Sequence, residues 1–322
     1  MSLQPDSLTL ANPGHAEGPR HILGIQELDR FSAADLQRWE TASAKMDELS
    51  NELFFSTEPI RRRLRPQLIA ALKGASSLPF AFDLWVRSVT YQYSLEPLSC
   101  AGSLTDIGGR FNAGFELDDS PLKPWPALYI AQDLETAYRE KFVLKSSENV
   151  DGLTPEELAL EGKISHTNVV LGGRIERVFD MTNFMSLNSV GKVLRQVKMP
   201  REAIKLKKAL KIPNKDLSMI QNGLQLFNLV TKNNWRVNPR QFGLPSQSQI
   251  LAELIRAAGY EAILYQSSKG PGRCMAVFPD KLSDQSFVEL SDRPPHQDTH
   301  TRLDSTTAPA LEGWEAVPRN MR

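Results

Sequence analysis

Two side chains in neighbouring segments have the types and the setting to act on a phosphorylated ligand. Arg110 lies in the glycine-bracketed stretch GGRFNAGF, residues 108–115, and Glu140 lies in ALYIAQDLETAYREKF, residues 127–142. A planar guanidinium can bind two phosphate oxygens, and the glycines beside it let backbone amides approach the same anion. Each residue is also typical of a plain turn or a solvated surface. Alone they support only a mixed α/β protein that binds a phosphorylated ligand.

Other residues occupy positions from which a cleft can be lined. Tyr129 alternates with aliphatic neighbours in a short strand, so its ring faces either the core or a cleft. Arg87 lies inside the aromatic and β-branched stretch 82–94, which has the composition of a strand. Ser267 and Ser268 follow the strand AILYQ beside a Lys-Gly-Pro-Gly loop, where serines are also ordinary turn formers.

The elements that must position these residues follow from the apolar pattern and the turn signals. Asp133 has the type and place of a helix N-cap, and Gly259 ends a later helical pattern. The pattern predicts strands at 82–94, 127–131, within 166–183, at 262–266 and 274–278, and helices at 133–144 and from 247 to 258.

The chain divides into four regions by composition. In the helical region at 21–80 the pattern predicts one helix from about Phe31 and another from Pro59 to a stop at Gly74. The regions are a disordered N-terminus at 1–20, a helical region at 21–80, a main domain at 81–291 with a basic helical insert near 184–240, and a disordered tail at 292–322, which is rich in Pro, Asp and Thr.

Composition excludes several classes of function. The formal net charge is zero, with 38 basic and 38 acidic residues, so nucleic-acid contact is not expected of the chain as a whole. Two cysteines and five histidines in no ligand spacing argue against a metal site or a disulfide scaffold. The N-terminus lacks a signal peptide and no window is apolar enough to span a membrane, which predicts a cytoplasmic location.

The order of these segments resembles the RES-domain family, named for a recurring Arg, Glu and Ser. The match consists of WVRSVTYQYS, LSCAGSLTDIGGRFNAGF, ALYIAQDLETAYRE, VFDMT and AAGYEAILYQSSK…MAVF. It covers roughly 82–145 and 166–280, apart from the insert. The sequence departs from the family at Phe111, where tryptophan is more usual, and at residues 273–275, where many members carry asparagine.

The resemblance implies a role for each matching residue. It implies an α+β, ADP-ribosyltransferase-like core of mixed or antiparallel sheets with helices, preceded by the N-terminal helical region. By this resemblance the catalytic residues are Arg110, Glu140 and Ser267, and the NAD-binding residues are Arg87, Tyr129 and Ser246. The resemblance leaves Ser268 as the alternative to Ser267.

The activity that the resemblance implies is consumption of NAD+. RES domains cleave the nicotinamide–ribose bond by hydrolysis or phosphorolysis, with NAD+ as substrate and no further cofactor. Many are toxins neutralised by a helix-turn-helix antitoxin. The acceptor, whether water, phosphate or a macromolecule, is left open by the sequence.

Two other functions remain open on the sequence. One is an ADP-ribosyltransferase that modifies a macromolecule. The other is a catalytically silent binding module that uses the basic segment 192–215, for which a solvated amphipathic helix is the simpler interpretation. The insert can serve as a lid over the cleft or as the surface of a homo-oligomer.

Overall fold

The computed structural model describes residues 33–75, 77, 79–117, 122–142, 165–214 and 216–313. The predicted disordered N-terminus at 1–20 lies outside the described residues. The chain forms two compact units, one made of residues 1–56 and 199–218 and the other of 57–198 and 219–322. The second unit contains the sheet and all the candidate site residues.

The second unit is built on a mixed sheet whose strand order is β10-β9-β5-β1-β4-β8-β7-β6 in the described residues. The pairs are antiparallel except β6 and β7, which run parallel. Between β6 and β7 the chain passes through a series of helices, as a parallel connection requires. The strands are β1 (Phe80–Thr90), β4 (Leu128–Ala131), β5 (His166–Ile175), β6 (Val178–Met181), β7 (Ala262–Gln266), β8 (Arg273–Val277), β9 (Phe287–Leu290) and β10 (Arg302–Leu303).

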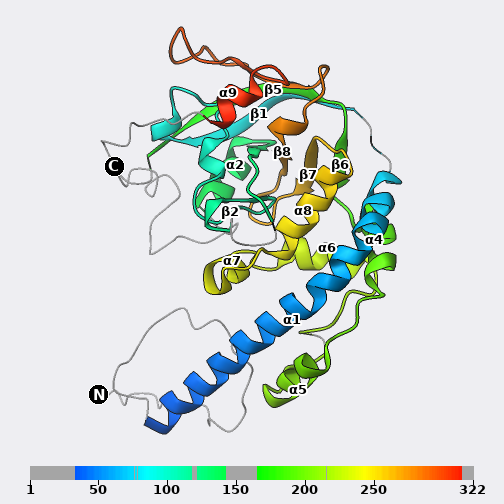
Figure 1. Cartoon of the computed structure of the whole chain (residues 1–322). Helices are drawn as coiled ribbons and strands as arrows, with labels where there is room; N and C mark the ends of the chain where they lie inside the picture. Colours follow the sequence, from blue (N-terminus) through cyan, green and yellow to red (C-terminus); the bar gives the residue numbers. More distant parts are fainter. Residues whose placement is uncertain are drawn as a thin grey trace, which may run out of the picture. The chain divides into compact units, whose positions relative to one another are not determined.

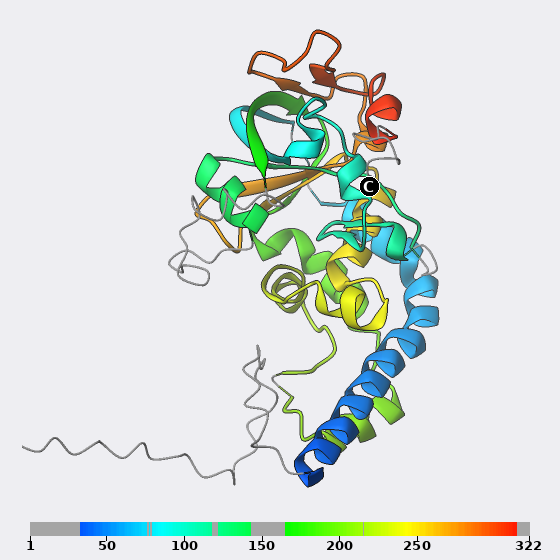
Figure 2. The same ribbon diagram turned by 90° about the vertical axis from the view of Figure 1, so that its left-hand side faces the viewer.

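Helices cover both faces of this sheet. Alternate residues of β8 enter two separate apolar clusters: Cys274 and Ala276 join one, and Met275 and Val277 join the other. The longer helices are α1 (Ala33–Lys73), α2 (Leu134–Phe142), α4 (Asn188–Leu194), α5 (Arg201–Ala209), α6 (Gly223–Lys232), α7 (Val237–Phe242), α8 (Gln247–Ala257) and α9 (Ala308–Glu312). In Figures 1 and 2, α8 (yellow) and α9 (red) lie on different sides of the strands. The prediction of an α+β fold with a mixed sheet and an N-terminal helix is confirmed.

The N-terminal helical region is one helix, so the prediction of two helices was wrong. Helix α1 continues through Pro59 and Pro66 to Lys73 (Figure 1). A proline inside a helix removes one hydrogen bond and clashes with the preceding turn. Leu64, Leu68 and Leu72 are nevertheless buried in the apolar cluster that also contains Cys274 and Ala276. Their packing keeps the turns after Pro59 helical.

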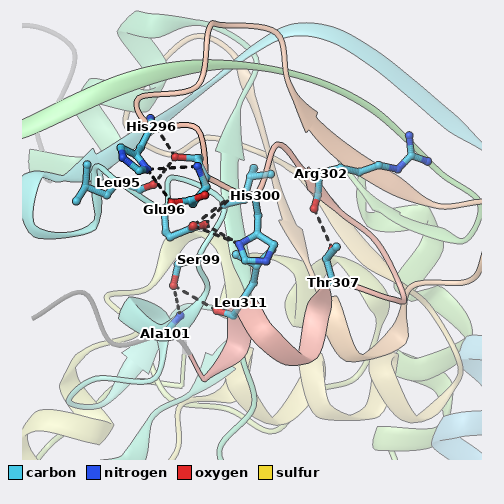
Figure 3. A network of polar contacts seen from close by, with 12 residues as sticks. Leu95, Glu96, Ser99, Ala101, His296, His300, Arg302, Thr307 and Leu311 are labelled. Carbon is cyan, nitrogen blue, oxygen red and sulfur yellow. Dashed lines mark hydrogen bonds and ion pairs between the residues drawn. The ribbon is translucent and has the colours of Figure 1, made fainter. Parts of the chain in front are cut away.

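The predicted disorder of the tail at 292–322 was wrong for residues 292–313. Leu303 and Leu311 are fully buried, and β10 pairs with β9. Figure 3 shows the polar contacts that tie this segment to residues 95–101. His300 donates its backbone N–H to the Glu96 carboxylate at 3.3 Å, and Thr299 donates its hydroxyl to the Leu95 carbonyl at 2.9 Å. The remaining residues, 314–322, lie outside the described part.

The basic segment 192–215 is divided between the two units. In the first unit, α5 is amphipathic, with Ala203 and Lys207 buried and most of its other residues exposed. The Lys207 ammonium donates to Asn214 Oδ1 at 2.7 Å and to the Leu217 carbonyl at 2.5 Å. This helix has the solvated amphipathic form that was the simpler interpretation of the segment.

Candidate functional site

A cavity of about 240 Å³ in the second unit is lined by three of the residues predicted from the sequence. Arg110, Tyr129 and Glu140 all contribute to its walls. They come from three elements: a hairpin tip, strand β4 and helix α2. The structure therefore brings together side chains that are 30 residues apart, from Arg110 to Glu140, in one hollow.

The arginine turn is the tip of a small hairpin made by β2 (Gly108–Gly109) and β3 (Asn112–Ala113). Gly108 has φ +80°, in the left-handed region that glycine adopts without strain. A Cβ at Gly109 would overlap the Tyr129 hydroxyl. The two glycines are therefore needed for the shape of the turn and for its close approach to β4.

The Tyr129 hydroxyl is hydrogen-bonded to the arginine turn. It accepts a hydrogen bond from the Phe111 N–H at 2.9 Å and donates one to Asn112 Oδ1 at 2.8 Å. Burial raises the pKa of Tyr129, so the phenol stays neutral and able to donate. The ring lines the cavity while the hydroxyl serves the turn.

Three backbone amides of the turn are already hydrogen-bonded within the protein, which corrects the expectation that they approach a phosphate. Gly108 donates its N–H to the Thr105 carbonyl at 3.0 Å, and Gly109 donates to Asn112 Oδ1 at 2.9 Å. The Phe111 N–H is bonded to Tyr129. Recognition of an anion at this turn must therefore come mainly from side chains.

Helix α8 makes a second set of hydrogen bonds to the same turn. The fully buried Gln249 side chain donates to the carbonyls of Ile107, Gly109 and Asn112 at 2.9–3.1 Å. Its Oε1 accepts from the Ser246 N–H at 2.9 Å. One amide side chain thus joins the start of α8 to the base of the hairpin.

Ser246 is the N-cap of α8 and does not line the cavity. Its hydroxyl accepts from the Gln249 N–H at 3.2 Å and lies 3.0 Å from the Ser248 hydroxyl. With the reciprocal bond from its own N–H to Gln249, this is a capping box, which satisfies two donors at a helix start. The contacts of Ser246 are those of a helix cap, and its predicted role in NAD binding stays a prediction.

The Arg110 guanidinium reaches the end of α6, within the insert. Its Nη1 donates to the carbonyls of Val230 at 3.0 Å and Thr231 at 2.9 Å. These are among the last carbonyls of the helix, which lack intrahelical partners and carry partial negative charge. Arg110 thereby ties the insert to the turn, while its Nε and Nη2 have no hydrogen-bond partner among the described residues.

Helix α2 presents Glu140 to the cavity. Its start is fixed by Asp133, which accepts the Thr136 N–H at 2.7 Å, as the sequence predicted for an N-cap. The Thr136 hydroxyl accepts from the Gly272 N–H at 2.9 Å and so attaches the 267–272 loop to the helix.

Ser267, and not Ser268, contacts the glutamate. The Ser267 hydroxyl donates to Glu140 Oε1 at 2.6 Å and accepts from the N–H groups of Lys269 at 3.0 Å and Gly270 at 2.9 Å. Such a short bond to a carboxylate is typical of a charge-assisted interaction. Ser267 is buried and Ser268 is exposed. The Arg110, Glu140 and Ser267 trio is thus assembled around one site, although their catalytic role stays a prediction.

Arg87 lies on strand β1 but is not among the residues that line the cavity. Its neighbours Val86 and Ser88 line it, and side chains alternate along a strand. Arg87 Nη2 donates to the Ser99 carbonyl at 2.7 Å, and burial lowers the pKa of the guanidinium. The structure therefore does not bring Arg87 together with Arg110 and Glu140 at the cavity wall, and its role in NAD binding stays a prediction.

Other cavity and turn residues were not singled out from the sequence. Trp235 and Arg236 line the cavity from the turn between α6 and α7. No local signal marks them, because the insert matches no motif. Asn112 and Gln249 do have signals: Asn112 belongs to the GGRFN motif, and Gln249 stands three residues after the Ser246 cap.

The two cysteines are buried free thiols. Burial raises the pKa of Cys100 to about 12 and that of Cys274, which lines the cavity, further still. Neither is therefore activated as a nucleophile at neutral pH. Within the described residues, no three His, Cys, Asp or Glu side chains form a metal-binding group, and no helix is long and apolar enough to cross a membrane.

Comparisons with known proteins include a distant likeness to a solved structure. No protein-family model matches the chain, and no curated protein matches it significantly. Among solved structures, the crystal structure of the M. tuberculosis MbcT-MbcA toxin-antitoxin complex is similar at 12% sequence identity, over 77% of this chain and 98% of that chain. The TM-score of this match is 0.39, too low to assign a function.

Proposed function

We propose that this chain binds NAD+ in the cavity and cleaves the bond between nicotinamide and ribose. The observation that carries the proposal is the Glu140 carboxylate, held by the Ser267 hydroxyl in the same cavity that Arg110 of the Gly-Gly-Arg turn lines. The motif order supplies the substrate class, because it resembles that of the NAD+-consuming RES domains.

The reaction has modest chemical needs that these residues fit. When the glycosidic bond breaks, its electron pair neutralises the cationic ring nitrogen, so nicotinamide leaves without a general acid. Positive charge then develops on the ribose, and a fixed carboxylate stabilises it or orients the attacking oxygen. Water yields ADP-ribose and a proton, while inorganic phosphate yields the ribosyl phosphate. Glu140 has the charge for either task, and Ser267 fixes its direction.

The size of the cavity suits part of a dinucleotide. At about 240 Å³ it is smaller than the roughly 300–1,000 Å³ of common ligand pockets. The rings of Tyr129, Tyr265 and Trp235 line it, and aromatic rings pack favourably on a planar heterocycle. The nicotinamide riboside half would occupy the cavity, and the rest of NAD+ would extend along its open side.

The biological role follows from the chemistry. An enzyme that depletes NAD+ in the cytoplasm would arrest its own cell, so we include a neutralising antitoxin in the proposal; its helix-turn-helix class comes from the resemblance to RES domains.

The test is release of nicotinamide from NAD+ by the purified protein, with and without phosphate. Glu140→Gln removes the charge and keeps the size, and it should lower kcat by ~10²–10⁴-fold. Glu135→Gln is the matched control on the same helix, because Glu135 is exposed and, among the described residues, forms a single ion pair, with Arg139, so its loss should change little.

Each outcome has a defined meaning. Nicotinamide release that Glu140→Gln abolishes and Glu135→Gln preserves supports the proposal, and phosphate dependence names the acceptor. Label from NAD+ appearing in protein or nucleic acid would instead identify a transferase. NAD+ that stays intact under all conditions would refute the proposal.

A further inference from the structure

The basic side chains of the cavity are not all neutralised by protein groups. Among the described residues, Arg110, Lys141 and Arg236 line it together with one carboxylate, that of Glu140. Lys141 donates its ammonium to the Thr90 hydroxyl at 2.5 Å. The Arg236 guanidinium makes no hydrogen bond or ion pair with any of the described residues.

Arg236 is held in place without being neutralised. Its guanidinium lies over the Trp235 ring at 4.7 Å from the centroid, a stacking that orients the plane and leaves the N–H donors at its edge available. Its backbone N–H donates to Asn234 Oδ1 at 3.2 Å, which fixes the turn. The side chain is exposed, so it marks the side on which the cavity opens to solvent.

Arg110 lies close enough to Arg236 for their two positive charges to interact. Partial burial and then the charge of Arg110 lower the pKa of Arg236, while the charge of Glu140 raises it. Arg110 uses only Nη1 on the carbonyls of α6, so two of its nitrogens remain available. Two guanidinium groups beside the one carboxylate of Glu140 leave an excess of positive charge, which a bound anion would stabilise.

We propose that Arg236, from the turn between α6 and α7, forms with Arg110 a phosphate-binding site at the open side of the cavity. This site rests on the proposed function for its ligand: either the pyrophosphate of NAD+ or an inorganic phosphate acceptor. A guanidinium fork matches phosphate oxygens in both cases. Because the N–H groups of Gly109 and Phe111 are already bonded, side chains supply most of the donors.

The variant that tests the site is Arg236→Ala, with Arg240→Ala as the control. Arg240 carries the same charge four residues along, but it lies near the carboxylates of Asp106 at 3.6 Å and Glu116 at 3.8 Å and does not line the cavity. Thermal melting confirms that both variants fold. Calorimetry then measures the affinity of each protein for ADP-ribose, inorganic phosphate and nicotinamide riboside, which carries no phosphate.

We expect Arg236→Ala to weaken binding of a phosphate-bearing probe by about tenfold or more and to leave nicotinamide riboside unchanged. Weaker ADP-ribose binding and a raised KM for NAD+ identify the pyrophosphate as the ligand. Weaker binding of inorganic phosphate, with an unchanged KM for NAD+, identifies the acceptor. Arg240→Ala should leave all these affinities within about twofold of wild type.

Failure of the site and failure of the proposed function are distinguishable. If wild type cleaves NAD+ and Arg236→Ala binds every probe as wild type does, the phosphate site is refuted and the proposed NAD+ cleavage is supported. If wild type binds ADP-ribose or phosphate through Arg236 but never releases nicotinamide, the site stands and the enzyme is refuted. If wild type binds neither ADP-ribose nor phosphate, the site is refuted.

Discussion

Replacement of Ser267 by alanine tests whether the Glu140 carboxylate must be held in one direction. The Ser267 hydroxyl makes three contacts: it donates to Glu140 Oε1 at 2.6 Å and accepts from the N–H groups of Lys269 and Gly270. Ser267→Ala removes all three at once. Ser268→Ala deletes the same hydroxyl one residue later, where the side chain is exposed and makes no hydrogen bond with the described residues.

The expected size of the effect follows from the bond to the carboxylate. Hydrogen bonds to charged groups contribute about 1.5–3 kcal/mol, whereas exposed substitutions away from such contacts stay within about 0.5 kcal/mol. For a unit of this size that corresponds to a fall in Tm of roughly 3–12 °C in Ser267→Ala. If the same energy holds Glu140 in its reactive position, kcat falls by about 10–150-fold, since 1.36 kcal/mol is tenfold in rate.

The assay separates a positioning role from a structural one. Nicotinamide release is measured over a range of NAD+ concentrations in wild type, Ser267→Ala, Glu140→Gln and the double variant. A residue that acts through Glu140 should lower kcat on its own but add little once the carboxylate is gone. Losses that add fully in the double variant, or equal losses in Ser267→Ala and Ser268→Ala, would refute the reasoning.

Three further changes test other parts of the structure. Tyr129→Phe should lower stability by about 1–3 kcal/mol by urea unfolding; because burial raises the Tyr129 pKa above its ordinary value of 10, wild type should also lose stability more steeply than the variant above that pH, and parallel pH curves would contradict this. Cys100 and Cys274 should react with iodoacetamide at pH 8 only after denaturation, and rapid labelling of the native protein would contradict their burial. Leu311→Ala should cost about 2–5 kcal/mol in urea unfolding, and an unchanged midpoint would contradict the packing of the tail.

The regular elements around the site were predictable because each has a local signal. The strand predicted at 127–131 is β4 (Leu128–Ala131), and the helix predicted to end at residue 258 is α8 (Gln247–Ala257). Alternating or helical apolar spacing, with a cap or a glycine at the end, determines such elements largely by themselves. Burial on one face then confirms what the pattern already indicates.

The errors lie where long-range contacts outweigh local composition. The tail has a polar, proline-rich composition, yet its residues 292–313 are ordered because Leu303 and Leu311 are buried in the apolar cluster that also contains Met275 and Val277. The break expected at Pro59 does not occur, since packing further along α1 maintains the helix. Trp235 and Arg236 could not be assigned to the site, because only the fold brings the insert to the cavity.

The residues of the GGRFN motif divide into two groups with different bearing on function. Gly109 and Asn112 build the turn: the first admits the Tyr129 hydroxyl, and the second accepts hydrogen bonds from that hydroxyl and from a backbone N–H. Arg110 lines the cavity together with Gly108 and Gly109, and it is the one of the three with a charged side chain, which is partly used to bind the end of α6. Matching the motif therefore indicates the shape of the turn more strongly than it indicates catalysis.

A loss of activity in Arg110→Ala would not separate a role in binding from the loss of the contact with α6. Glu140 and Arg236 give the sharper tests, because Glu140 is bonded by one replaceable hydroxyl and Arg236 by no described acceptor.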